Sequence, residues 1–150
     1  MPQSLSTILI HIIFSTKNRE PLLMPEIESI LYSYMAGIFR DCGSPALAIG
    51  GTEDHTLVLC SLSRTRSVAS IVEEIKTGSS KWIKTKGPGF NGFHWQRGYA
   101  AFSIGRSNEV ILKRYIANQK LHHKKISFQD EMREFFQKYG VAYDEQFVWD

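Results

Sequence analysis

The feature that most constrains the fold is an apolar run near the N-terminus, Ser6–Ser15, which reads Ser-Thr-Ile-Leu-Ile-His-Ile-Ile-Phe-Ser. β-Branched and aromatic residues dominate this run, and such residues favour extended backbone. A polar cluster that ends in a proline, Lys17–Pro21, breaks the pattern immediately afterwards. The run therefore predicts a central strand of a β-sheet.

The segments that follow alternate between helical and extended patterns. Apolar residues recur at three- and four-residue spacing from Pro25 to Asp41, which predicts an amphipathic helix that ends before Gly43. We expect further strands at 46–49, 55–62, 93–96 and 99–104, and further helices at 67–84, 108–123 and 128–139. This order is typical of an α+β fold: a ferredoxin-like antiparallel sheet with helices on one face, followed by a C-terminal tyrosine-bearing helix and tail.

The length of 150 residues, with 43% hydrophobic residues, predicts one domain over 1–150, in which 126–150 form an acidic C-terminal tail. Every apolar run is well short of the roughly 20 residues that a membrane-spanning helix needs. The N-terminus lacks the basic region and long apolar stretch of a signal peptide. Cys42 and Cys60 are too few for a disulfide scaffold, so we expect reduced thiols and a cytoplasmic protein.

The net charge of +3 conceals a strong asymmetry along the chain. Residues 81–125 contain ten Lys or Arg and a single acid, Glu109, whereas 126–150 contain six acids and two bases. A concentrated basic block favours a polyanionic partner, and nucleic acid is the commonest such partner. The alternative is a solvated basic surface that has no partner.

Two side chains within the basic block point to chemistry. Tyr115 and Gln119 are four residues apart, so on a helix they project from the same face, one turn apart. A phenol that can attack phosphorus would then lie beside an amide oxygen that can hold a metal. The ordinary pKa of tyrosine is about 10, so a metal or basic neighbours must favour its phenolate at neutral pH. The pair predicts one half of a DNA-cleaving site.

The strand that is predicted to begin at His55 offers the other half. In a strand, His55 and Leu57 point to the same side. A His-x-His pattern at these positions would present two imidazoles to one metal. Here the chain presents one histidine and one leucine.

Several further stretches belong to the same pattern, in this order along the chain: His11–Lys17, Gly50–His55, Ser79–Ile83, Trp95–Tyr99 with Phe102-Ser103, and Tyr115–Gln119. In these stretches, which are spread over residues 11–119, the sequence resembles the HUH single-tyrosine transposases of small insertion sequences, the IS200-like group. Each stretch is weakly specific alone, and their shared order makes the resemblance fairly specific.

The resemblance implies a mechanism and a set of residue roles. Tyr115 matches the nucleophile, while His55 and Gln119 match ligands of one Mg²⁺ or Mn²⁺. The tyrosine attacks the scissile phosphate, forms a 5′-phosphotyrosine link and releases a 3′-OH; a second 3′-OH later attacks that link, so strands are exchanged without ATP. Members of the family form homodimers that act on single-stranded DNA with hairpin ends, and the tyrosine helix of one subunit can serve the metal site of the other.

The chain departs from the family at Leu57, which stands where the second histidine belongs. An alkyl side chain cannot donate to a metal, so two protein ligands remain, and Mg²⁺ can bind through few protein ligands and several waters. Candidates for a substitute ligand are Glu53, Asp54, His122 and His123. We expect phosphate contacts from basic residues in and beside the site: Lys81, Lys84, Arg97, Lys113, Arg114 and Lys120.

Two other functions are compatible with the sequence. Because of Leu57, the chain could be a weakened or inactive relative that only binds hairpin single-stranded DNA. It could also be a ferredoxin-like RNA-binding protein, a class that displays aromatic residues on an open sheet face. The third strand, which reads His55-Thr56-Leu57-Val58-Leu59-Cys60, lacks such an aromatic run.

Overall fold

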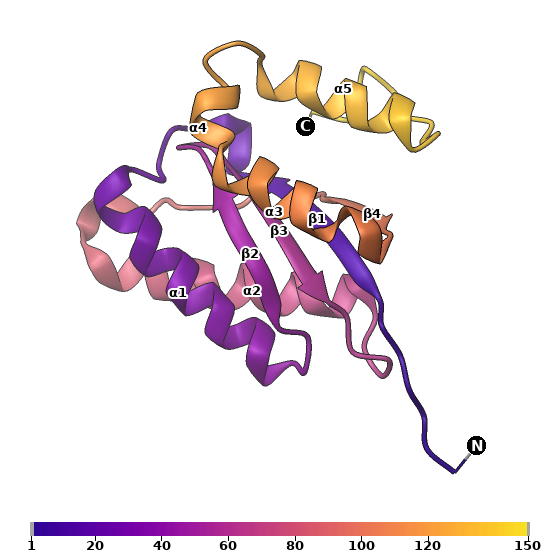
Figure 1. The fold of residues 1–150 in the computed structure, drawn as a ribbon. Coiled ribbons are helices and arrows are strands. Elements are labelled where there is room, and N and C mark those ends of the chain that lie inside the picture. Colours follow the sequence, from indigo (N-terminus) through magenta and orange to yellow (C-terminus); the bar gives the residue numbers. More distant parts are fainter. Residues whose placement is uncertain (1, 150) are drawn as a thin grey trace.

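A computed structural model describes residues 2–149. Its centre is a four-stranded sheet in the order β2-β3-β1-β4 (Figure 1). The strands are β1 (Leu9–Ser15), β2 (Ala46–Gly51), β3 (His55–Ser61) and β4 (Ala100–Ile104), and all neighbours are antiparallel. The predicted central position of the first strand and the ferredoxin-like strand order are both confirmed.

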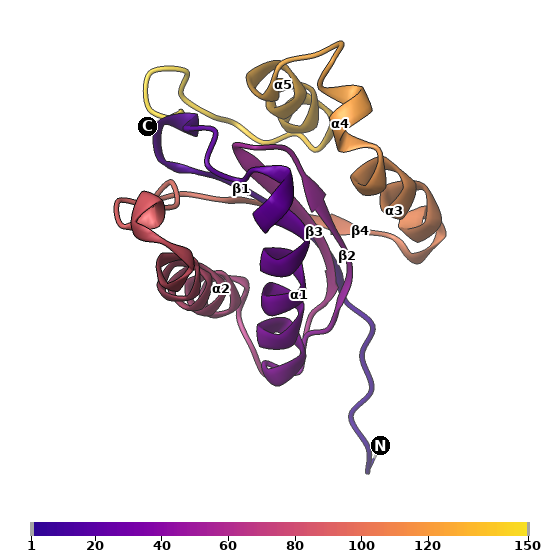
Figure 2. The same cartoon turned by 90° about the vertical axis from the view of Figure 1, so that its left-hand side faces the viewer.

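Two long helices, α1 (Pro25–Asp41) and α2 (Val68–Ile83), cover one face of the sheet (Figure 2). Side chains along a strand point alternately to the two faces of the sheet, so every second residue faces these helices. Ile12 and Phe14 of β1 and Val58 of β3 point this way. They pack with the apolar stripes of the two helices, whose buried members are Ile27, Leu31, Met35, Phe39, Ile71, Val72, Ile75 and Ile83.

Three shorter helices cover the opposite face: α3 (Glu109–Ala117), α4 (Gln119–His122) and α5 (Phe128–Lys138) (Figure 2). The strand residues of the other parity, among them Ile13, Leu57 and Leu59, are buried beneath these helices. Their helical partners are Leu112, Ile116, Met132 and Phe136. The segment predicted as an acidic tail thus contributes a helix to a second apolar core.

Two sequence-based predictions of local structure are wrong. The segment 93–96 is not a strand, because only Trp95 forms a bridge, to Thr16. The helix predicted over 108–123 is interrupted at Asn118, which separates α3 from α4. Short 3₁₀ helices complete the chain at Lys17–Arg19, Lys84–Lys86, Pro88–Phe90 and Arg106–Asn108.

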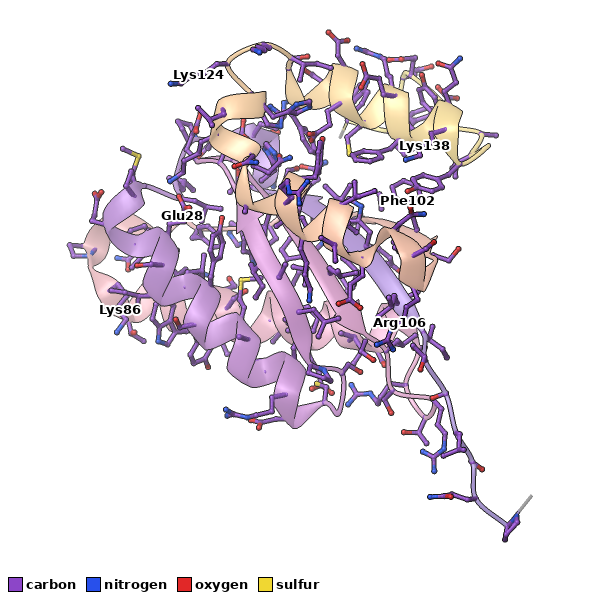
Figure 3. All side chains as sticks on the ribbon, viewed as in Figure 1. Glu28, Lys86, Phe102, Arg106, Lys124 and Lys138 are labelled. Atoms are coloured by element: carbon purple, nitrogen blue, oxygen red, sulfur yellow. The ribbon has the colours of Figure 1, made fainter. Side chains whose placement is uncertain are left out.

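The basic residues are spread over both sides of the sheet. Lys86 lies just beyond α2 on one side, whereas Lys124 lies in the turn between α4 and α5 on the other (Figure 3). Within residues 2–149, no helix combines the length and the apolar character needed to cross a bilayer.

Candidate active site

His55 is the first residue of β3, and its side chain is buried beneath α4 and α5. Its Nδ1 atom lies 2.7 Å from Oδ1 of Asp54 and 2.9 Å from the hydroxyl oxygen of Thr52. Burial raises the pKa of Asp54, but the hydrogen bond and charge of His55 outweigh it and hold that pKa below its ordinary value. An ionised carboxylate only accepts hydrogen bonds, so Nδ1 carries a hydrogen and Nε2 is left to face a ligand.

Gly50, near the end of β2, sets how closely α3 approaches the sheet. A Cβ atom placed on Gly50 would overlap the backbone carbonyl oxygen of Ile116. A residue without a side chain is therefore required where this helix crosses the strand. The close approach positions the end of α3, and with it Tyr115 and Gln119, over the start of β3.

Tyr115 and Gln119 lie on either side of the break at Asn118, where φ is −101° and ψ is 18°. Gln119 is buried, and its Oε1 atom lies 3.2 Å from Nε2 of His55. Its Nε2 atom donates a hydrogen bond of 3.2 Å to Glu131 on α5. The phenol of Tyr115 donates to the same carboxylate oxygen, so both side chains meet at Glu131 despite the break.

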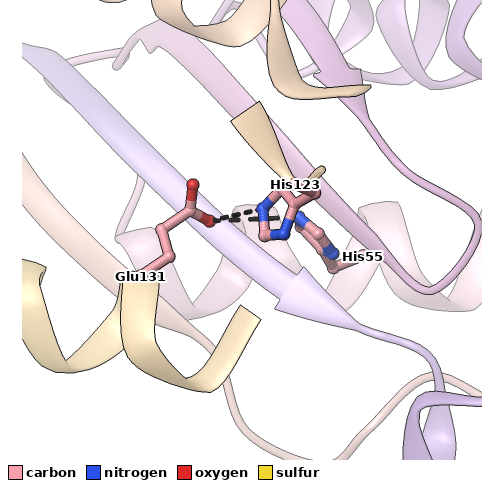
Figure 4. Close-up of side chains that lie close together, drawn as sticks. All are labelled: His55, His123 and Glu131. Carbon is pink, nitrogen blue, oxygen red and sulfur yellow. Dashed lines mark hydrogen bonds and ion pairs between the residues drawn. The ribbon is translucent and has the colours of Figure 1, made fainter. Parts of the chain in front are cut away.

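Glu131 is the residue on which the contacts of the site converge, and its side chain is only 1% exposed. Figure 4 shows it beside His55 and His123. Its Oε1 atom lies 3.1 Å from Nε2 of His123 and 3.9 Å from Nε2 of His55. Its Oε2 atom lies 3.3 Å from Nε2 of His122. Three imidazoles, an amide and a phenol thus surround one buried carboxylate.

Glu131 escapes notice in the sequence when 126–150 is regarded as an acidic tail. A signal is nevertheless present, because Glu131 interrupts an apolar stripe with helical spacing that consists of Phe128, Met132, Phe135 and Phe136. Acidic side chains are rarely fully buried unless they are paired. An acid on such a stripe therefore indicates a buried polar site.

The electrostatics of the pair Tyr115 and Glu131 favour a neutral phenol. Burial, followed by the hydrogen bond and negative charge of Glu131, raises the pKa of Tyr115 well above its ordinary value. For Glu131, burial raises the pKa, but hydrogen bonds from His123 and Tyr115 outweigh it and lower the pKa overall. In this state the carboxylate is ionised and the tyrosine keeps its proton.

Leu57 faces the same side of the sheet as His55 and is completely buried in the apolar core beneath α3 and α5. It packs with Ile13 and Phe102, so no donor atom stands where the family has its second histidine. His11 lies on the same face of β1, buried, with the edge of its ring against Phe135 at 5.3 Å between ring centres. Burial lowers the pKa of His11 to about 4, which keeps this imidazole neutral.

Donor atoms suited to a divalent cation are grouped at this place. Within residues 2–149, ligating atoms of His55, His123 and Glu131 all lie within 4.8 Å of one another. The carbonyl oxygen of Gln119 adjoins them. Imidazole nitrogen together with carboxylate and amide oxygen suits Mn²⁺ and related ions, so the residues present fit such a metal.

The four candidate substitutes for the missing histidine occupy three different positions. His122 and His123 both adjoin Glu131. Asp54 instead contacts Nδ1 of His55, on the side of the ring away from Gln119, where it orients the imidazole. Glu53 is exposed, and its backbone carbonyl accepts a hydrogen bond from the amide of Leu23.

The six basic residues expected to contact phosphate occupy different surroundings. Arg114 is exposed and lines a pocket of about 590 Å³ together with Tyr115, His122, Lys124 and Lys125. Lys120 borders a neighbouring pocket of about 430 Å³. Ion pairs engage two of the six, Lys120 with Glu28 at 3.0 Å and Lys113 with Glu109 at 2.8 Å.

The remaining three lie away from Tyr115. Lys81 and Lys84 belong to α2 and the turn after it, on the opposite face of the sheet. Arg97 is exposed in the loop before β4. The structure thus brings together Tyr115, Gln119 and His55 in one site, with Arg114 and Lys120 beside it, but not the other four residues expected to contact phosphate.

Comparison with known proteins identifies the family of the chain. The family model described as "Transposase IS200 like" matches residues 4–119. The chain belongs to this family. The matched region of this IS200-like transposase ends at Gln119, so α5 and Glu131 lie beyond it. No curated protein matches the chain.

Two solved structures share the fold of this IS200-like transposase. A candidate transposase from Deinococcus radiodurans R1 is 21% identical, with a TM-score of 0.62 over 77% of this chain and 93% of that one. A REP-associated tyrosine transposase bound to a REP hairpin is 15% identical, with a TM-score of 0.62 over 95% of this chain and 89% of that one. At these identities the likeness establishes the fold alone.

Proposed function

We propose that this IS200-like transposase cleaves and rejoins single-stranded DNA through a 5′-phosphotyrosine intermediate on Tyr115. The observation that carries the proposal is the convergence of Tyr115, Gln119 and His55 of one chain on a single buried site. A phenol, an imidazole nitrogen and an amide oxygen are the groups that the family's reaction requires. Tyr115 and Arg114 line the same pocket, so a phosphate that approaches the phenol would meet a positively charged side chain.

In the proposed reaction, the phenolic oxygen of Tyr115 forms a bond to phosphorus while the bond between phosphorus and the 3′ oxygen breaks. The phenol loses its proton, and the departing 3′ oxygen takes up a proton to become a hydroxyl group. Attack by a second 3′-OH reverses these bond changes and joins two strands. The ester preserves the bond energy, so no nucleotide cofactor is needed.

His55 and Gln119 are the proposed ligands of Mg²⁺ or Mn²⁺. A bound divalent cation would polarise the phosphate and favour ionisation of the phenol. Asp54 and Thr52 hold the His55 ring so that Nε2 faces the site. Gln119 donates through its amide nitrogen to Glu131, which turns its carbonyl oxygen toward His55.

The proposed substrate is single-stranded DNA with hairpin ends. The solved relative that is bound to a REP hairpin supports this choice. Phosphate contacts are proposed for Arg114 and Lys120 beside the site, and for Lys81, Lys84, Arg97 and Lys113 elsewhere. Binding that rests on such contacts should weaken steeply as the salt concentration rises.

We further propose a homodimer that acts in the cytoplasm. The edge strands β2 and β4 each leave one side of their backbone outside the sheet, and such edges can pair with another chain. The buried thiols of Cys42 and Cys60 are free, which suits a reducing compartment.

The test of this function is a covalent adduct. The protein is incubated with Mn²⁺ and a hairpin-bearing DNA strand labelled on the 3′ side of the cleavage point, and the products are separated under denaturing conditions. A labelled protein–DNA band is expected for the wild type and not for Tyr115→Phe. Equal amounts of adduct from both proteins would overturn the assignment of Tyr115.

A second candidate function is hairpin binding without cleavage, and the buried alkyl side chain of Leu57 favours it. In that case hairpin DNA would bind in a salt-dependent way, and no metal would induce an adduct. The RNA-binding alternative loses its structural basis, because α3 and α5 cover the sheet face that such proteins use for stacking.

A further inference from the structure

The acceptor atoms around Glu131 are arranged so that a cation could bind among them. Gln119 donates through Nε2 to Glu131, so its Oε1 atom, which lies 3.2 Å from Nε2 of His55, is an acceptor. The Nδ1 hydrogen of His55 is engaged by Asp54, which leaves Nε2 as a second lone-pair atom. Oε1 of Glu131 is a third, 3.9 Å from Nε2 of His55.

Three electron-pair donors that face one another repel unless something positive lies among them. A divalent metal ion bound by all three atoms can fill that role. Leu57 stands where a second histidine of the strand would be, so β3 supplies only one ligand, His55. A carboxylate that reaches the same place from α5 restores the number of ligands to three.

We propose that Glu131 is the third metal ligand and takes the place of the histidine that Leu57 has displaced. His123 then acts as a positioning residue, because its Nε2 atom lies 3.1 Å from Oε1 of Glu131 and holds the carboxylate toward His55. This inference rests on the proposed metal-dependent function and deepens it, since it assigns a ligand outside the region that matches the family.

The ligand set also determines which ion is preferred. A set with one imidazole, one carboxylate and one amide oxygen is less suited to Mg²⁺, which prefers oxygen ligands and retains several waters, than to Mn²⁺. The site is expected to bind Mn²⁺ more tightly than Mg²⁺. Glu131 also ties α5 to the metal, so metal binding should stabilise α5 against the sheet.

The test is Mn²⁺ binding to the full chain without DNA, measured by the loss of the free-ion signal in electron paramagnetic resonance. Glu131→Gln keeps the shape of the side chain and removes its charge. The matched control is Glu134→Gln, an exposed acid on the same helix. We expect at least about tenfold weaker binding for Glu131→Gln and unchanged binding for Glu134→Gln. Equal affinities for wild type and Glu131→Gln would overturn the inference.

Two further measurements keep the result unambiguous. Far-ultraviolet circular dichroism establishes whether Glu131→Gln is folded. If it is not, Tyr115→Phe and His55→Gln replace it, both made with glutamate labelled with ¹³C at the side-chain carboxyl carbon. Pulsed electron paramagnetic resonance on Mn²⁺ should reveal coupling to a labelled carboxylate and to imidazole nitrogen in Tyr115→Phe, and the imidazole coupling should be lost in His55→Gln. Absence of Mn²⁺ binding by the wild type would also overturn the inference.

The adduct assay separates this inference from the proposed function. If the wild type forms a Tyr115 adduct but Glu131→Gln binds Mn²⁺ as tightly as the wild type, the proposed function stands and Glu131 is not a ligand. Loss of Mn²⁺ affinity in Glu131→Gln without any adduct from the wild type would retain the ligand and reject the function.

Discussion

The phenolic hydroxyl of Tyr115 donates its hydrogen to the carboxylate of Glu131, a residue sixteen positions later in the same chain. This contact fixes the nucleophile of the proposed reaction within reach of His55 and Gln119 of its own chain. It also holds the phenol in its protonated form, since the neighbouring negative charge and burial both raise the pKa of Tyr115. In this structure Tyr115, His55 and Gln119 of the same chain therefore lie together.

A site assembled within one chain predicts the outcome of a mixing experiment. Tyr115→Phe lacks the nucleophile and His55→Ala lacks a metal ligand, so each protein alone should form no adduct. If both groups act in the same chain, a mixture of the two variants should remain inactive even after subunits have exchanged. Recovery of adduct in the mixture would mean that the tyrosine of one subunit serves the metal site of the other, as the family resemblance allows.

Restoring the missing histidine should bring no benefit. Leu57 is completely buried in an apolar core, so an imidazole in its place would lose packing and would replace a ligand role that Glu131 already fills. We expect Leu57→His to lower the free energy of unfolding by about 1–3 kcal/mol and to leave the adduct yield unchanged or reduced. Chemical denaturation and the adduct assay measure the two effects. A clear gain of cleavage in Leu57→His would favour the binding-only function for the wild type.

Gly50 is expected to be essential for the geometry of the site. In Gly50→Ala the new methyl group would overlap the carbonyl oxygen of Ile116 and push α3 away from the sheet. The expected cost is about 1–3 kcal/mol of stability, together with a loss of adduct, because Tyr115 moves with the helix. Gly98→Ala is the matched control, since its Cβ would meet no atom within 4 Å. Similar behaviour of the two variants would contradict the account.

The buried imidazole of His11 predicts a dependence of stability on pH. Burial lowers its pKa from 6.5 to about 4, so the unfolded chain takes up a proton before the folded chain does. The free energy of unfolding is therefore unaffected by protonation of His11 above pH 6.5 and decreases as the pH falls from 6.5 toward 4. This decrease amounts to roughly 3 kcal/mol. His11→Leu should lose less stability than the wild type over this interval, whereas the exposed His94→Leu should behave like the wild type; parallel curves for all three would refute the prediction.

Much of the fold follows from local sequence patterns. The central place of the first strand and the helix at Pro25–Asp41 could be predicted, because a continuous apolar run and helical spacing report directly on how an element is buried. The break at Asn118 could not, because neither a proline nor a glycine marks it in the sequence. The segment 93–96 is apolar enough for a strand, yet Phe93 and Trp95 are buried as individual side chains in a loop.

Some residues of the candidate site could be predicted from the sequence, and one could not. Tyr115, Gln119 and His55 could be singled out because their spacing and their setting resemble a known family. Glu131 could not be connected with them, because its role arises from the packing of α5 over the start of β3, which no local pattern encodes. The substitutes that the sequence suggests are neighbours of His55 and Gln119 along the chain, whereas Glu131 lies on a separate helix.

The central claim, that Tyr115 is the nucleophile, is tested most directly by mass spectrometry of the protein after reaction with hairpin DNA and Mn²⁺. Digestion of the trapped adduct should yield a single modified peptide, with a nucleotide joined through phosphate to Tyr115. Modification of another residue, or an unmodified Tyr115 in a sample whose DNA has been cleaved, would contradict the claim.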